Sequence, residues 1–463
     1  MAVMAYRDGV PAFIEAMFRN ETPARLRLWT ASAVCATVAL LLSVSLVMAQ
    51  VRDQIGVIGR EAAPQAATAA DLYFALSDLD AQVTRILLAG DNDELAGSRI
   101  DALGAYRDRG HQVDQDLQRS LTTGAGQAER AIVLDLMDGL AVYRQRVGQA
   151  VTAQATAPPA GAGQLAPAAL GYYTQATNLL HQRLLPAARE LREAGTERLD
   201  DAYARKTATE GTGVTLVLLL GGALLGLLLG LQIWLARRFR RTWSPPLAVA
   251  TALGAILALA SIVVLHAQSG QLADGRDRGL GPYLALSELR ALGYDAAADT
   301  GRYVVSANLA YYRDDFDSKS ACLTGTAACR SPEVSPAAGE TAPVSAPGAP
   351  RGGLIRLAGT ETADRWIAYQ SGHERILALA DDGRTAEAVR LLTGIRRGDA
   401  AFDFAYFDAS LAGVTEARAQ EFDRALRAAE RTTTGWVVLP VVTLTLVALL
   451  IPYGVRRRLA EYR

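Results

Sequence analysis

The sequence predicts an all-α membrane protein with four transmembrane helices and two extracytoplasmic domains that are built like four-helix bundles. Three observations support this prediction. Four apolar runs are each long enough to cross a hydrocarbon core of about 30 Å, which takes roughly 20 helical residues. The long polar segments between them show apolar residues at helical spacing. The second polar segment also repeats parts of the first, which indicates an internal duplication.

The predicted spans are residues 28–49, 212–236, 245–267 and 435–455. Half of the residues are hydrophobic and the mean hydropathy is +0.12, as expected for a membrane protein with sizeable polar parts. The short pieces 1–27, 237–244 and 456–463 are rich in arginine. By the positive-inside rule these pieces are cytoplasmic, so we expect a multi-pass protein of the plasma membrane with both termini inside.

The first outside segment, residues 50–211, is helical almost throughout. A four–three spacing of apolar residues predicts its first helix: Leu72, Leu76, Leu79, Val83 and Ile86. A break at Ala89-Gly90-Asp91 precedes a second helix over about 94–121, and a third contains Val133, Leu136, Leu140, Tyr143 and Val147. A Pro/Ala/Gly linker leads to a fourth helix, which Pro186 should kink. Four helices with short connections predict an up-down bundle.

The second outside segment, residues 268–434, resembles the first near both ends. YFALSDL at 73–79 corresponds to YLALSEL at 283–289, and ERLDDAYARKTAT at 197–209 corresponds to QEFDRALRAAERT at 420–432. The second copy carries an extra stretch, residues 318–353, rich in Pro, Ala, Gly and Ser. Because this composition buries little apolar surface, we predict a disordered insertion there.

The three cysteines have different expected roles. Cys322 and Cys329 are close in sequence and lie in a segment predicted to face an oxidising compartment, so we expect a disulfide. In the chain-entropy view, closing this small loop contributes roughly 2–3 kcal/mol. Cys35, inside the first span, is expected to be a small packing residue.

The sequence carries no recognisable catalytic motif. The four histidines are scattered, and the sequence contains no P-loop, nucleophile elbow or zinc pattern. The acidic doublets are expected to be solvated: Asp200-Asp201, Asp314-Asp315 and Asp381-Asp382. Among Asp, Glu, Lys, Arg and His, the predicted spans contain His266 alone, near an outer end, whereas pumps place such groups at mid-membrane. We therefore expect a protein that is not an enzyme, with no catalytic or metal site, no cofactor and no nucleic-acid partner.

Small residues mark the two central spans. Gly222, Gly226 and Gly230 recur every four residues in one, and Ala250, Gly254 and Ala258 do so in the next. Such faces let helix backbones approach closely. The stripes are interpreted either as packing between neighbouring spans of one chain or as the contact face of a homodimer.

The turn between these spans, RRFRRTWSPP, is strongly basic. It contains Arg237, Arg238, Arg240, Arg241 and Trp243. One interpretation is anchoring to anionic membrane lipid, worth about 1 kcal/mol per arginine near the surface. The other is a docking site in which arginine forks bind carboxylates of a soluble cytoplasmic partner. Because only short pieces lie inside, any cytoplasmic output has to pass to a separate protein.

Four spans, paired helical outside segments, the RRFRRTWSPP turn and the RRR tail together resemble the GlnX-type membrane proteins of actinobacteria. The resemblance implies a signal transducer with two partners, the GlnH amino-acid-binding lipoprotein outside and the PknG Ser/Thr kinase inside. It also implies a report on aspartate and glutamate availability. Each outside half further resembles the four-helix ligand-binding domains of chemoreceptors and sensor kinases, although no HAMP or signalling domain follows any span.

Two other function classes remain open on the sequence. A permease or mechanotransmission subunit of an ABC-type transporter would need a cytoplasmic element that docks an ATPase, and the short turn at 237–244 leaves little room for one. A cell-envelope scaffold would need no ligand. A neighbouring gene for a binding lipoprotein and a kinase would favour sensing, and one for an ATPase would favour transport.

Overall fold

The computed structural model describes residues 22–122, 126–158, 163–239, 244–326, 353–436 and 438–460. It is 92% helical, and no strand occurs among these residues. Four of its helices are long and apolar enough to cross a membrane. The predicted all-α class and the four candidate spans are therefore confirmed.

The chain divides into two compact units. The first, which we call the membrane unit, comprises residues 1–57, 202–273 and 425–463. The second, which we call the bundle unit, comprises residues 58–201 and 274–424. The sequence predicted two outside domains, but most of both segments folds into this single unit. The reason is that one helix from each segment is buried against the other, as described below.

The membrane unit contains α2 (Thr22–Val57), the later part of α7 (Leu185–Phe239), α8 (Pro245–Asp274) and α15 (Leu439–Ala460). α7 packs on α2 where Gly213 meets Val47, and α8 packs on α15 where Leu247 meets Gly454. The Gln232 amide donates to Thr251 Oγ1 at 2.9 Å between α7 and α8. Large apolar side chains point outward on all four helices, as a lipid-facing surface requires: Leu42, Leu219, Leu259 and Leu449.

The first half of the bundle unit contains α3 (Ala63–Ala89), α4 (Ala96–Thr122), α5 (Gln127–Thr156) and α6 (Pro167–Leu179). The predicted apolar seams of α3 and α5 are buried at every position, and all of their residues except Ile86 belong to one hydrophobic cluster. Gly90, with φ of 54°, ends α3 at the predicted break. A π-helical turn, η3 (Leu180–Leu184), precedes α7 and accommodates the missing N–H of Pro186.

The second half contains α9 (Gly281–Val305), α10 (Ala310–Thr324), α11 (Leu354–Ala358), α12 (Thr360–Asp381), α13 (Thr385–Thr393) and the early part of α14 (Ala400–Thr433). Its cluster is aromatic, with Trp366, Tyr369, Phe316 and Phe407 almost fully buried. The disordered insertion was predicted to begin at residue 318. This boundary is wrong, because residues 318–324 belong to α10 and pack on this core. Residues 327–352 lie outside the described part of the chain.

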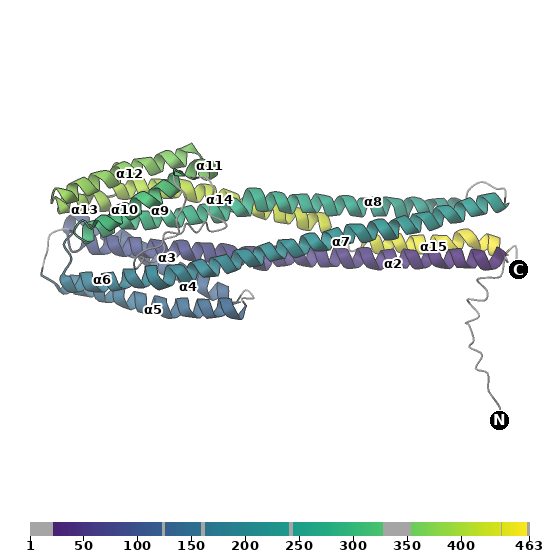
Figure 1. Ribbon diagram of the computed structural model, residues 1–463, viewed down its shortest axis with the longest axis horizontal. Coiled ribbons are helices and arrows are strands. Elements are labelled where there is room, and N and C mark those ends of the chain that lie inside the picture. Colours follow the sequence, from purple (N-terminus) through teal and green to yellow (C-terminus); the bar gives the residue numbers. More distant parts are fainter. Residues whose placement is uncertain are drawn as a thin grey trace, which may run out of the picture. The chain divides into compact units, whose positions relative to one another are not determined.

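α3 and α9 lie side by side and join the two halves (Figure 1). They run parallel, with Thr84 facing Gly301, where a methyl group in place of the glycine hydrogen would collide with the threonine. The repeated segments 73–79 and 283–289 lie on these two helices. Each helix follows a π-helical turn, η1 (Ile58–Ala62) or η4 (Gly275–Leu280). The residues that face each other across the two helices are not the residues that match in sequence: the two alignments are shifted by about two helical turns. The internal duplication therefore stays a prediction.

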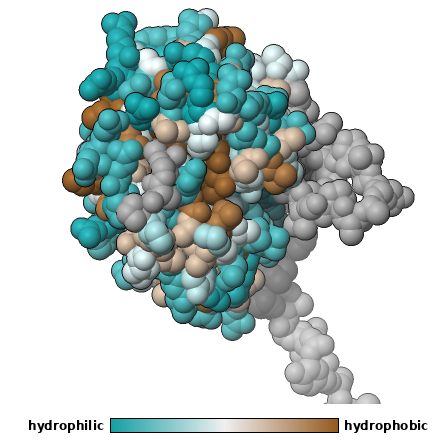
Figure 2. Space-filling model, turned by 90° about the vertical axis from the view of Figure 1, so that its left-hand side faces the viewer, coloured by the Kyte–Doolittle hydropathy of each residue, from teal (hydrophilic) through white to brown (hydrophobic). Residues whose placement is uncertain are grey.

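One end of the bundle unit is shown in Figure 2. A small group of apolar side chains lies in the middle of that face, and hydrophilic side chains surround it. The site described next lies in the interior of the unit, where Asp80, Asp299 and Arg302 are buried.

Candidate functional site

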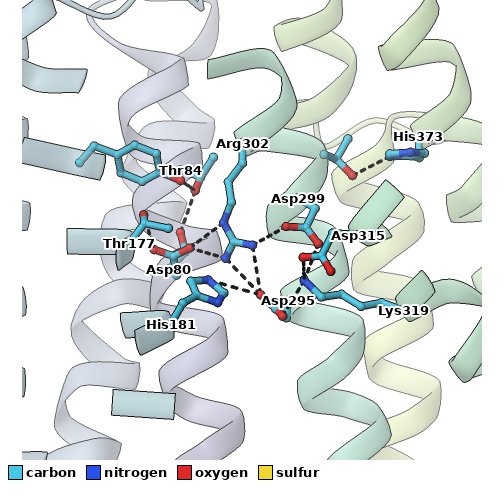
Figure 3. A network of polar contacts seen from close by, with 12 residues as sticks. Asp80, Thr84, Thr177, His181, Asp295, Asp299, Arg302, Asp315, Lys319 and His373 are labelled. Carbon is cyan, nitrogen blue, oxygen red and sulfur yellow. Dashed lines mark hydrogen bonds and ion pairs between the residues drawn. The ribbon is translucent and has the colours of Figure 1, made fainter. Parts of the chain in front are cut away.

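A cluster of charged side chains is buried between α3 and α9 (Figure 3). Arg302 of α9 is its centre, with 2% of its side chain exposed. Its Nη2 lies 2.5 Å from Asp80 Oδ2 of α3, and its Nη1 lies 3.1 Å from Asp295 Oδ1 and 2.5 Å from Asp299 Oδ1. One guanidinium thus holds a carboxylate from each half of the unit.

Lys319 of α10, in the second half of the bundle unit, belongs to the same cluster. Its Nζ lies 2.7 Å from Asp295, 2.5 Å from Asp299 and 2.8 Å from Asp315. Asp315 is a quarter exposed, so solvent reaches this edge. Asp315 of the predicted solvated pair Asp314-Asp315 is therefore only partly solvated, because the buried ammonium of Lys319 holds it.

The carboxyls of this cluster differ in their readiness to ionise. Burial raises the pKa of Asp299, and the nearby Lys319 and Arg302 only partly offset that loss of hydration. Burial opposes the ionisation of Asp295 as well, but Lys319 and Arg302 outweigh it and lower the pKa of Asp295. Asp295 therefore stays charged, whereas Asp299 is the more readily protonated of the two.

Two histidines lie near this cluster in neutral form. His181 of η3 has Nε2 3.8 Å from Asp295, yet burial and the positive charge of Arg302 lower the pKa of His181 to about 4. His373 of α12 is stacked on Phe316 and shares a 2.8 Å hydrogen bond with the Thr300 hydroxyl. Burial lowers the pKa of His373 to about 3. Both rings are therefore uncharged at neutral pH.

Such a cluster fixes how α3 lies on α9. Charges taken out of water are tolerated only where each finds a partner in good geometry, so intermediate positions of the helices are costly. Small residues on α9 allow the close approach of α3 that this needs, among them Ala297, Ala298 and Gly301. The arrangement is suited to a discrete change of packing between the halves, which is the kind of element that a sensor requires.

The predicted docking turn can be placed only in part. Arg237 is exposed near the end of α7. The helix continues through Arg238, but the side chain of that residue is not described, and Arg240, Arg241 and Trp243 lie outside the described residues. Contact of this turn with a cytoplasmic partner or with lipid stays a prediction.

The small-residue stripes lie in the membrane unit. A methyl group added at Gly222 or Gly226 would meet nothing within 4 Å, whereas at Gly230 it would lie 3.0 Å from Trp29. On α8, Ala250 and Gly254 are buried and Ala258 is half-buried. Within one chain the α8 stripe is covered, and the exposed Gly222–Gly226 face leaves the homodimer interpretation open.

The cysteines are placed as follows. Cys322 is buried near the end of α10 and takes part in a disulfide, but its predicted partner Cys329 lies outside the described residues, so the Cys322–Cys329 pairing stays a prediction. Cys35 is in α2 and is exposed on the membrane unit. Its expected packing role inside the chain is therefore wrong, because its side chain faces away from the neighbouring helices.

Comparison with known proteins adds one family. Residues 54–204 match the family model of the actinobacterial sensor domain. This range covers α3 to α6, η3 and the first part of α7, and so includes Asp80 and His181. The comparisons with curated proteins and with solved structures find no match. The match supports a role in sensing a signal and is consistent with a non-catalytic protein.

Proposed function

We propose that the chain is a non-enzymatic signal transducer of the plasma membrane, with the bundle unit outside the cell. The observation that supports this most strongly is the sensor-domain match over residues 54–204 in a chain with four candidate spans. The sensed condition is the supply of aspartate and glutamate, reported through a solute-binding lipoprotein of the GlnH kind. The output goes to a soluble cytoplasmic Ser/Thr kinase of the PknG kind, as in GlnX-type proteins.

The buried cluster supplies a physical basis for this role. Arg302 pairs with Asp80 across the two halves, so a partner that favours one packing of α3 on α9 has to compete with desolvated ion pairs. A bound lipoprotein can shift that equilibrium only by its difference in affinity for the two packings. α7 and α14 each contribute residues to both units, which links the change covalently to the spans.

Deletion and complementation test this function. In cells that carry the wild-type chain, adding L-aspartate or L-glutamate should change the phosphorylation of the kinase's substrates. The change should be lost on deletion of the gene and restored by the wild-type copy. A response that persists without the chain contradicts the proposal. Loss of amino-acid uptake with an unchanged phosphorylation response would favour a transporter subunit instead.

A further inference from the structure

A cavity of about 160 Å³ lies inside the bundle unit, among α3, α9, α12, α13 and α14. Small apolar side chains form much of its wall, including Ala81, Ala297, Ala298 and Ala401. Two rings in edge-to-face contact, Tyr294 and Phe404, form part of the rest. A cavity of about 150 Å³ accepts a benzene-sized guest, so this one has room for a small organic molecule.

One cation at this cavity makes no ion pair within 4.0 Å among the described residues. Arg85 lines it, and among the described residues its recorded hydrogen bond is a long one, 3.3 Å to the Gln82 amide oxygen. Its Nε is buried and makes no hydrogen bond, and no ion pair of Arg85 is found in the described part of the chain. Burial lowers the pKa of Arg85, which reflects the cost of keeping this charge out of water.

The packing of α3 on α9 explains why no carboxylate of the two helices pairs with Arg85. Two parallel helices in contact are related by a local two-fold axis between them, and the facing pair Thr84 and Gly301 sets the register. In this register Arg85 corresponds to Arg302, and Asp80 corresponds to Ala297. Arg302 reaches across to the Asp80 carboxylate. On the other side of the axis the position opposite Arg85 is Ala297, which has no carboxylate, and both residues line the cavity.

We propose that this cavity binds a small organic monocarboxylate, with the ligand carboxylate on the Arg85 guanidinium and its apolar body against Ala297 and Phe404. The guanidinium fork matches a planar carboxylate with two parallel hydrogen bonds. A polyanion such as phosphate fits poorly, because Asp408 also lines the cavity. Arg290 holds Asp408 at 2.5 and 2.8 Å, and this carboxylate beside the cavity disfavours a second negative charge on the ligand.

This proposal goes beyond the relay from a lipoprotein to a kinase and does not depend on it. A direct ligand would act by stabilising the α3–α9 packing that keeps the cavity open. Direct binding is measured on the purified chain, whereas the relay is measured in cells, so either can fail while the other holds.

The binding test uses the full chain in lipid nanodiscs and isothermal titration calorimetry. The probes are isobutyrate and benzoate, each compared with its neutral amide. Both carboxylates should bind at least about tenfold more tightly than the amides, since a charge-assisted hydrogen bond contributes that much or more. Arg85→Met should weaken carboxylate binding by about 10- to 100-fold. Arg183→Met, which removes an exposed arginine paired with Asp135, is the matched control and should bind as the wild type does.

A second variant provides a readout that needs no ligand. Ala297→Asp places a carboxylate opposite Arg85, as Asp80 stands opposite Arg302, so it should raise the unfolding temperature and abolish carboxylate binding. The proposal is overturned if neither carboxylate binds more tightly than its amide, or if Arg85→Met binds both as well as the wild type. A lower unfolding temperature for Ala297→Asp with unchanged probe binding would also overturn it.

Discussion

Replacing Arg302 with methionine, which keeps most of the side-chain volume, should strongly destabilise the bundle unit. The change removes the guanidinium from Asp80, Asp295 and Asp299, with contacts of 2.5 to 3.1 Å. Lys319 still pairs with the last two, but among the described residues the Asp80 carboxylate keeps only a 3.3 Å hydrogen bond from Thr177. Breaking a buried pair by removing one partner costs about 3–5 kcal/mol. At about 2 °C per kcal/mol for a domain of this size, the unfolding temperature should fall by roughly 6–10 °C.

The assay is thermal unfolding of the purified chain in detergent, followed by circular dichroism. Arg183→Met is again the control, because its ion pair with Asp135 is about half exposed and should matter little. Adding Asp80→Asn to Arg302→Met should recover part of the loss, since it removes the stranded charge. The reasoning is refuted if Arg302→Met lowers the unfolding temperature no more than Arg183→Met does.

Three further predictions concern other parts of the chain. Cys322 and Cys329 should react with maleimide in intact cells only after a reductant is added, and immediate labelling of both would rule out the disulfide. Arg238→Gln together with Arg240→Gln should insert normally yet lose the phosphorylation response to amino acids. An unchanged response at equal protein levels would leave the turn with a lipid-anchoring role. His373 is neutral in the fold with a pKa of about 3, below its unfolded value of 6.5, so it contributes stability above pH 6.5 that is lost as the pH falls towards 3. His373→Phe should make that loss shallower, by up to about 1.4 kcal/mol per pH unit, and an identical pH profile would contradict this.

The helices could be predicted because their signals are local. Leu72, Leu76 and Leu79 recur at helical spacing and are buried as expected. The four apolar runs are long enough to identify the candidate spans without any tertiary information. The joining of the two segments into one unit could not be predicted in this way. It depends on the packing of α3 against α9, and a local sequence pattern does not predict which helices of the two outside segments pack together.

The charged cluster was missed because each member looks ordinary in sequence. Asp80 and Asp299 resemble the solvated acids found on any helix, and Asp200 and Asp201 are indeed exposed. One signal was present: α9 places Asp295, Asp299 and Arg302 in a stretch rich in alanine and glycine, which favours a central helix packed on several sides. Charges on such a helix have to find partners within the protein. Arg85 has no such signal, because its lack of an ion pair among the described residues depends on the residue opposite it.

The location of the central turn tests the account most directly, because a sensor needs its bundle unit and its docking turn on opposite sides of the membrane. A reporter inserted within residues 237–244 should read cytoplasmic, as should one fused after Arg463. A reporter at residues 335–345, between α10 and α11, should read outside the cell. An outside reading for the 237–244 turn would contradict the proposal that a signal received by the bundle unit is delivered to a cytoplasmic partner.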